Sequence, residues 1–317
     1  MGIDDDLDPG EGTALSPQEL LGLDELLEQS QRGSEADDLR ELRAFLTRLP
    51  MLGPYNAALV QLQRPGAHYV ASRSVWAREF HRHVLPGARP LIILRPFGPV
   101  DLVYDIADTD GQPVPEGALA PFRIDGPITE EGLTAFTSLL PKAGVLYREE
   151  AVGSQLAGTV EPIDPPLTCE GTRRSVPLRH AVVVSSQLDP TARLVTAFHE
   201  LGHVFARHLD HRTESTVRPG RPLDLRSREF EAEIVAWLLA ARLGIDSPAG
   251  EYLAGYVEAD GTVPPFSLQA VVSAAGRIES MAGGLAQLAR LLRTGQTITD
   301  SPAHGPHQEE LDLGAWA

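Results

Sequence analysis

The stretch TAFHELGHVFARH, from Thr196 to His208, contains two histidines and a glutamate in the pattern H-E-x-x-H. Residues four apart in a helix lie on one face, so His199 and His203 can offer ring nitrogens to one metal ion. Glu200 follows His199 directly, where a base can take a proton from water bound by the metal. The spacing therefore predicts a zinc site with His199 and His203 as ligands and Glu200 as the catalytic residue.

The residues around this pattern favour a metal site over a coincidence, which a chain with ten histidines also permits. The expected helix runs from about Pro190 to His208, with Asp189 as N-cap, and is otherwise apolar. A glutamate between two histidines in a buried helix is costly unless something compensates its charge. A strand at Ala181–Ser185 precedes the helix, and its edge could pair with the backbone of a substrate by strand addition.

A catalytic zinc site needs a third protein ligand, and the next helix, from about Ser227 to Leu243, offers acidic candidates. Glu229 and Glu233 share one face of this helix, beside small alanines that allow close approach to the first helix. We assign Glu229 as the third ligand and Glu233 as the carboxylate that orients a ligand histidine. Glu231 remains the rival, and a solvated acidic stripe is the alternative interpretation.

Two further histidines, His208 and His211, fall at offsets from the motif that do not suit a shared metal ion. The continuation H-x-x-G-x-x-H, which would supply a third histidine, is absent, because Ala206 and Leu209 occupy the glycine and histidine places. We therefore expect His208 and His211 to lie on the surface.

Composition limits the remaining functions. The chain has 317 residues, a formal net charge of −17 and one cysteine, Cys169, so an internal disulfide and a zinc site of several thiolates are excluded. The N-terminus is acidic, and no apolar run is long enough to span a bilayer. We expect a soluble, cytoplasmic protein without membrane contacts.

The pattern of helices, strands and turn residues predicts an α+β fold with two domains. Residues 1–15 are expected to form a disordered acidic tail, residues 16–128 a small α/β domain, residues 129–294 the domain with the predicted zinc site, and residues 295–317 a flexible tail. Helices are expected at 17–30, 35–49, 55–63, 130–140, 248–256 and 267–293, and strands at 68–70, 89–94 and 100–106. The segment 162–172 reads as a proline-rich connection.

The motif TAFHELGH followed by EFEAEIVAWLLA, at residues 229–240, resembles the ImmA/IrrE family of zinc metallopeptidases. That family pairs H-E-x-x-H with a later E-x-E-A-x-x-x-A motif, matched here by Glu229, Glu231, Ala232 and Ala236. The resemblance implies a zincin fold, with a preceding strand, an active-site helix and a second ligand-bearing helix. It also implies a gluzincin-like ligand set, whose third member would be the first glutamate of the motif.

The upstream half is similar to the N-terminal domain of ArdC-like antirestriction proteins, which implies binding to single-stranded DNA. The features that carry the similarity are Asn56, Gln63-x-Pro65, Trp76, Gly87–Pro90 and the strand that ends at Pro96. Residues 51–100 contain six arginines and one glutamate, whereas residues 1–50 contain thirteen acidic residues and four arginines. Arginines of the basic segment 64–95 could contact phosphates, while Tyr69 and Trp76 could stack on bases. Alternatively, Tyr69 and Trp76 belong to the core and the arginines form a solvated face.

Together these patterns predict a zinc-dependent endopeptidase that acts on a cytoplasmic protein, in particular a DNA-associated protein or a transcriptional repressor. The alternative function is a single-strand DNA-binding antirestriction or regulatory protein whose zincin domain has little or no activity.

Overall fold

The computed structural model describes residues 43–95, 98–114, 126–151, 157–168, 176–209, 223–246, 253–257 and 262–296. The predictions for residues 1–15, the helix at 17–30, Cys169 and His211 lie outside these ranges. So do most of the helix predicted at 248–256 and nearly all of the tail predicted at 295–317.

The N-terminal part contains a small antiparallel sheet in the order β1-β4-β3, with helix α3 packed against β3. A two-stranded ribbon, β2 with β5, and the short helix α4 complete it. The elements are α3 (Pro54–Gln63), β1 (Val70–Ser72), α4 (Arg73–Glu79), β2 (Arg82–Val84), β3 (Leu91–Arg95), β4 (Gly98–Asp105), η2 (Ile106–Asp108) and β5 (Thr109–Gly111).

Helix α3 protects the free edge of β3 through two amide side chains. Asn56 accepts a hydrogen bond from the Leu94 N–H at 3.0 Å and donates to the Leu94 carbonyl at 3.1 Å. Gln63, two helical turns later, makes the same pair of bonds to Ile92, both at 2.8 Å. The two amides therefore satisfy backbone groups that an edge strand would otherwise leave open to another chain.

Tyr69 and Trp76 belong to the core of the N-terminal part. Both rings are buried and contact each other edge to face, and the Trp76 indole donates to the Tyr104 carbonyl at 2.9 Å. Neither ring is exposed for stacking on a base. Within the basic segment, Arg64 forms ion pairs with two aspartates and Arg82 bonds the backbone around Thr109, so both guanidinium groups have partners within the protein.

The second sheet has the order β6-β8-β7, in which β8 is parallel to β6 and antiparallel to β7. Its elements and the preceding helices are α6 (Glu130–Thr137), η3 (Leu140–Ala143), β6 (Val145–Glu150), β7 (Gly158–Thr168) and β8 (Pro177–Ser185). Because β8 is the central strand, both of its edges are occupied. The expectation that Ala181–Ser185 pairs with a substrate is therefore wrong.

Strand β7 corrects the prediction of a proline-rich connection at 162–172. Its prolines are tolerated because β7 is an edge strand, where a missing N–H need not break the sheet. The register slips between Pro162 and Leu167, where the prolines are concentrated. The regular half of β7 thus begins at Gly158.

The helices that follow in the described ranges are α7 (Pro190–Phe205), α8 (Leu225–Arg242), α10 (Leu268–Met281) and α11 (Leu285–Thr294). The single helix predicted at 267–293 is two helices, because Gly283 and Gly284 both have positive φ, 87° and 107°. Asp189 caps α7 as predicted, accepting hydrogen bonds from the Thr191 and Ala192 N–H groups.

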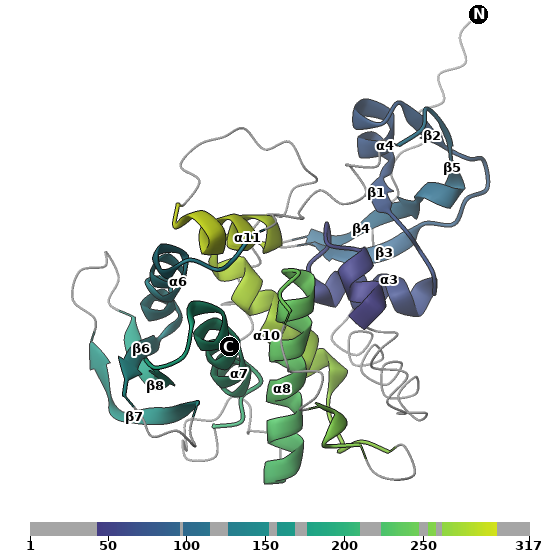
Figure 1. The fold of residues 1–317 in the computed structure, drawn as a ribbon. Helices are drawn as coiled ribbons and strands as arrows, with labels where there is room; N and C mark the ends of the chain where they lie inside the picture. The colour runs from purple at the N-terminus through teal and green to yellow at the C-terminus, as the bar shows by residue number, and fades with distance from the viewer. Residues whose placement is uncertain are drawn as a thin grey trace, which may run out of the picture.

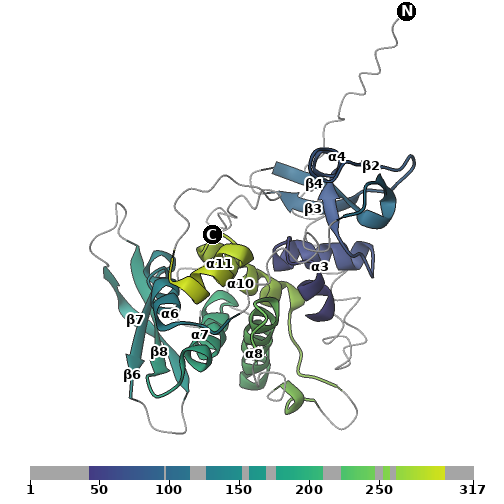
Figure 2. The same ribbon diagram turned by 45° about the horizontal axis from the view of Figure 1, so that its top comes forward.

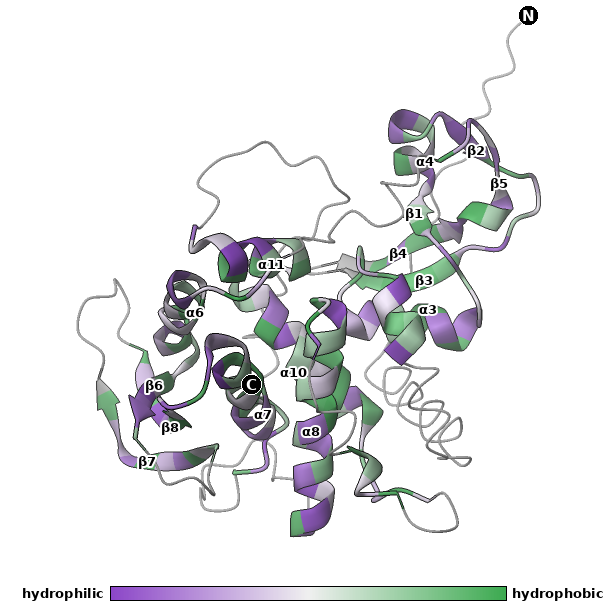
Figure 3. Cartoon of the chain, in the orientation of Figure 1, coloured by the Kyte–Doolittle hydropathy of each residue, from purple (hydrophilic) through white to green (hydrophobic). Residues whose placement is uncertain are grey.

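Figures 1 and 2 show the helices α7, α8 and α10 between the sheet β6-β8-β7 and the N-terminal sheet. The buried apolar residues of both parts form one continuous cluster. Figure 3 shows that α8 is hydrophobic along its later turns and more polar along its first turns. No helix in the described ranges is long and apolar enough to cross a membrane.

Candidate metal centre

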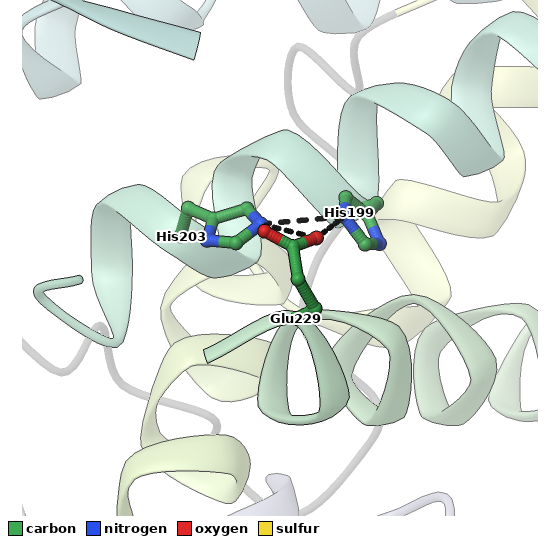
Figure 4. A group of neighbouring side chains, drawn as sticks. All are labelled: His199, His203 and Glu229. Carbon is green, nitrogen blue, oxygen red and sulfur yellow. Dashed lines mark hydrogen bonds and ion pairs between the residues drawn. The ribbon is translucent and has the colours of Figure 1, made fainter. Parts of the chain in front are cut away.

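The predicted ligands His199, His203 and Glu229 lie together where α7 crosses the first turns of α8. Figure 4 shows both imidazoles projecting from α7 toward the Glu229 carboxylate, which rises from α8. The distance between the two histidine Nε2 atoms is 3.3 Å. Glu229 Oε2 lies 3.4 Å from the His199 Nε2 and 3.5 Å from the His203 Nε2.

This triangle of donor atoms has the dimensions of a zinc site. Zinc bonds to nitrogen and oxygen of about 2.0–2.1 Å in tetrahedral geometry place neighbouring ligand atoms roughly 3.3–3.4 Å apart. The three observed edges lie within about 0.2 Å of that spacing. Two imidazoles and one carboxylate are also a ligand set that zinc uses in catalytic sites. These residues could therefore hold a zinc ion and leave a fourth position open.

Close approach of α7 and α8 brings the ligands within reach of one another. A Cβ atom added at Gly202 would lie 3.1 Å from the Ala232 Cα and 3.4 Å from its Cβ. A larger side chain at either position would push the helices apart. The small residues expected on α8 thus permit this contact, together with a glycine on α7.

Glu233 of α8 contacts His199 on the side away from the triangle. Its Oε2 lies 3.0 Å from the His199 Nδ1. In the neutral His199 ring, a hydrogen bond donated from Nδ1 to Glu233 leaves the Nε2 lone pair directed at the triangle.

The electrostatics of the cluster favour a bound cation. Burial alone lowers the pKa of His199, but hydrogen bonds to Glu229 and Glu233 and the charge of Glu200 raise this pKa to about 10. Interactions with the side chains of His199 and then His203 hold the pKa of Glu229 far below its usual value. Burial lowers the pKa of His203. The cluster thus stabilises one positive charge among its carboxylates, which a proton or a metal ion can supply.

Glu200 lies next to the triangle, in a space kept open by Gly158 of β7. A Cβ atom added at Gly158 would lie 3.3 Å from the Glu200 Oε1 and 2.6 Å from the Thr196 Cγ2. The Glu200 side chain is buried, and burial raises its pKa to about 7. A carboxylate with this pKa can both accept and release a proton near neutral pH.

His208 is not on the surface, so that expectation is wrong. Its side chain is 2% exposed. Helix α7 ends at Phe205, and Arg207 adopts a positive φ of 64°, which turns the chain back. The His208 N–H then bonds the His203 carbonyl at 2.9 Å. Helical spacing could not reveal this position, because the helix has ended before it.

Glu231, the rival ligand, lies outside the triangle. Its side chain is fully buried, and its Oε2 lies 2.9 Å from the His208 Nε2. Tyr256 lies near the site, where its ring packs on Phe230 of α8. Burial, and then the charges of Glu229 and Glu233, raises the pKa of Tyr256.

Comparison with known protein families covers the region that contains this cluster. The family model Peptidase_M78, described as the IrrE N-terminal-like domain, matches residues 166–249, a span that includes all of α7 and α8. No curated protein and no solved structure matches the chain. The matched region is therefore similar to a metallopeptidase domain of the ImmA/IrrE family. No match covers residues 16–128, so the ArdC-like resemblance stays a prediction.

Proposed function

We propose that this protein is a zinc-dependent endopeptidase of the zincin class. His199, His203 and Glu229 would hold the metal, and Glu200 would act as general base. The observation that carries the proposal is the triangle of three donor atoms, with edges of 3.3, 3.4 and 3.5 Å. The match to the metallopeptidase family model supports it.

Zinc, when bound, would polarise the scissile carbonyl group and make a water molecule more acidic. Glu200 would take a proton from such a water and would later give it to the leaving amine, roles that a pKa near neutrality suits. Glu233 keeps His199 in the tautomer that can bind metal.

The substrate would be an extended peptide segment that adds to the edge of β7. Among the described residues, β7 pairs with β8 alone, and its first residue, Gly158, lies beside Thr196 and Glu200 of α7. Backbone groups of this edge can therefore align a peptide across the site. The resemblance noted from sequence suggests a DNA-associated or repressor protein in the cytoplasm as its source.

Elemental analysis combined with a proteolysis assay tests the proposal. The wild-type protein, purified without chelator and offered zinc, should hold about one zinc ion, and Glu229→Ala should lose most of it. Glu200→Gln should keep the zinc but cleave a diverse peptide library about 10²- to 10⁴-fold more slowly, since only the proton acceptor is lost.

Two outcomes would contradict the proposal. A wild-type protein that binds no zinc would mean that the cluster is not a metal site. Zinc binding without any cleavage that depends on Glu200 would favour the alternative, a regulatory or DNA-binding protein with an inactive zincin domain.

A further inference from the structure

A buried chain of hydrogen bonds leads away from His203, on the side opposite the triangle. The His203 Nδ1 lies 3.0 Å from the His208 Nδ1. The His208 Nε2 lies 2.9 Å from the Glu231 Oε2. The Glu231 Oε1 accepts a hydrogen bond from the backbone N–H of Ser267, at the start of α10, at 2.6 Å. Four groups from three helices and one turn are thus connected in series.

The direction of every bond in this chain follows from the ionised carboxylate of Glu231, which can only accept. A backbone N–H can only donate, and a carboxylate can only accept. The His208 Nε2 must therefore carry a proton and donate it to Glu231. In neutral His208 the Nδ1 is then an acceptor, so the His203 Nδ1 must donate to it. This leaves the Nε2 of His203 without a proton, with its lone pair facing the triangle.

We infer that Glu231 and His208 are positioning residues for His203, which fix its tautomer and ring orientation for metal binding. The inference rests on the proposed function. Glu233 positions His199 in the same way but directly, because its Oε2 lies 3.0 Å from the His199 Nδ1. For His203 the carboxylate of Glu231 acts through an additional imidazole, that of His208, because Glu231 lies deeper between α8 and α10 and contacts His208.

Burial makes the arrangement specific. Glu231 is 0% exposed and His208 2% exposed. Water cannot replace a missing partner at such positions, so each group depends on the one before it.

The substitution Glu231→Gln reverses the direction of the chain without changing its shape. The Ser267 N–H requires the amide oxygen on its side, so the amide nitrogen must face His208 and donate to its Nε2. His208 then carries its proton on Nδ1 and donates it to the His203 Nδ1. The single ring N–H proton of His203 must therefore lie on Nε2. A protonated Nε2 cannot bind a metal.

We expect Glu231→Gln to weaken zinc affinity by about 10- to 100-fold, measured by competition with a chromophoric chelator. The cobalt-substituted protein should show an altered absorption spectrum, which a purely structural role for Glu231 would not produce. Glu279→Gln is the matched control, because Glu279 is a buried carboxylate on α10 that contacts Arg242 and not the site. This variant should keep the wild-type zinc affinity.

A second measurement needs no variant and covers the case in which Glu231→Gln does not fold. Nitrogen-15 NMR of the histidine rings in the zinc-loaded wild-type protein should place the His208 proton on Nε2 and the His203 proton on Nδ1. A His208 ring protonated on Nδ1, or on both nitrogens, would overturn the inference.

The outcomes separate the two proposals. If the wild-type protein binds zinc and Glu231→Gln binds it equally well, the positioning role is wrong and the proposed function stands. If the wild-type protein binds no zinc, the proposed function fails and the positioning role fails with it.

Discussion

Gly158 is the residue on which the space around Glu200 depends. It lies on β7, a different element from the H-E-x-x-H motif, and any side chain there would meet the Thr196 methyl group at 2.6 Å. Thr196 is β-branched and held in a helix, so it has little freedom to rotate away. The Glu200 carboxylate is the next nearest side-chain group, at 3.3 Å.

We expect Gly158→Ala to destabilise the fold by about 1–3 kcal/mol through overpacking. It should also slow peptide cleavage by displacing Glu200, while the zinc content stays unchanged because none of the three donor residues is touched. Urea denaturation and the peptide-library assay measure the two effects. Adding Thr196→Ser, which removes the methyl group, should recover most of the stability. No recovery would show that the clash is not the cause.

At the scale of elements, helix α3 substitutes for a neighbouring strand at the edge of β3. Asn56 and Gln63 each make a pair of hydrogen bonds to alternate residues of the strand. The two amides were among the features that resemble ArdC-like proteins. In this structure they serve the fold, since they protect a strand whose sequence, LIILR, is strongly apolar.

Asn56→Ala should therefore destabilise the protein by about 1–3 kcal/mol, the net value of two hydrogen bonds. Asn56→Asp, which keeps the acceptor for the Leu94 N–H but places a carboxylate oxygen against the Leu94 carbonyl oxygen, should cost at least as much. Thermal denaturation measures both, and light scattering should detect self-association through the opened edge. Equal stability of all three proteins would mean that water replaces the amide without loss.

At the scale of the whole molecule, Arg242 joins the N-terminal part to the helices of the candidate metal centre. It forms an ion pair with Glu279 of α10 at 2.6 Å and donates to the carbonyl groups of Leu46 and Leu52, at 2.5 and 2.8 Å. The side chains of Arg242 and Glu279 are both buried. The pair thus lies where residues 43–52 meet α8 and α10.

Arg242→Met leaves the Glu279 charge buried without its partner, so we expect a loss of about 3–5 kcal/mol of stability. Unfolding by urea should remain a single transition, because one apolar cluster runs through both parts. Arg242→Met combined with Glu279→Leu should be less destabilised than Arg242→Met alone. Two separate transitions would contradict the shared core.

Much of the site was predictable from sequence because its rules are local. The H-E-x-x-H spacing, the cap at Asp189 and the i, i+4 relation of Glu229 and Glu233 all follow from helical geometry. The helices α3, α6, α7 and α8 lie close to their predicted bounds for the same reason. Strands were harder to predict, and β6 was missed. The prolines of β7 suggested a connection rather than a strand, because proline is compatible with a strand only at the edge of a sheet, and the sequence does not show which strands are at an edge.

The sequence by itself determined which side chains could bind a metal on each helix, because the helical repeat assigns residues to faces. Tertiary structure decided which face of α8 meets α7. The contact of Gly202 with Ala232 brings Glu229 to the two histidines and turns Glu231 inward. It also decided the place of His208, because a left-handed residue after the helix end redirects the chain into the core. Rotation about a helix axis and the path after a helix end depend on packing between distant segments, and no local pattern encodes them.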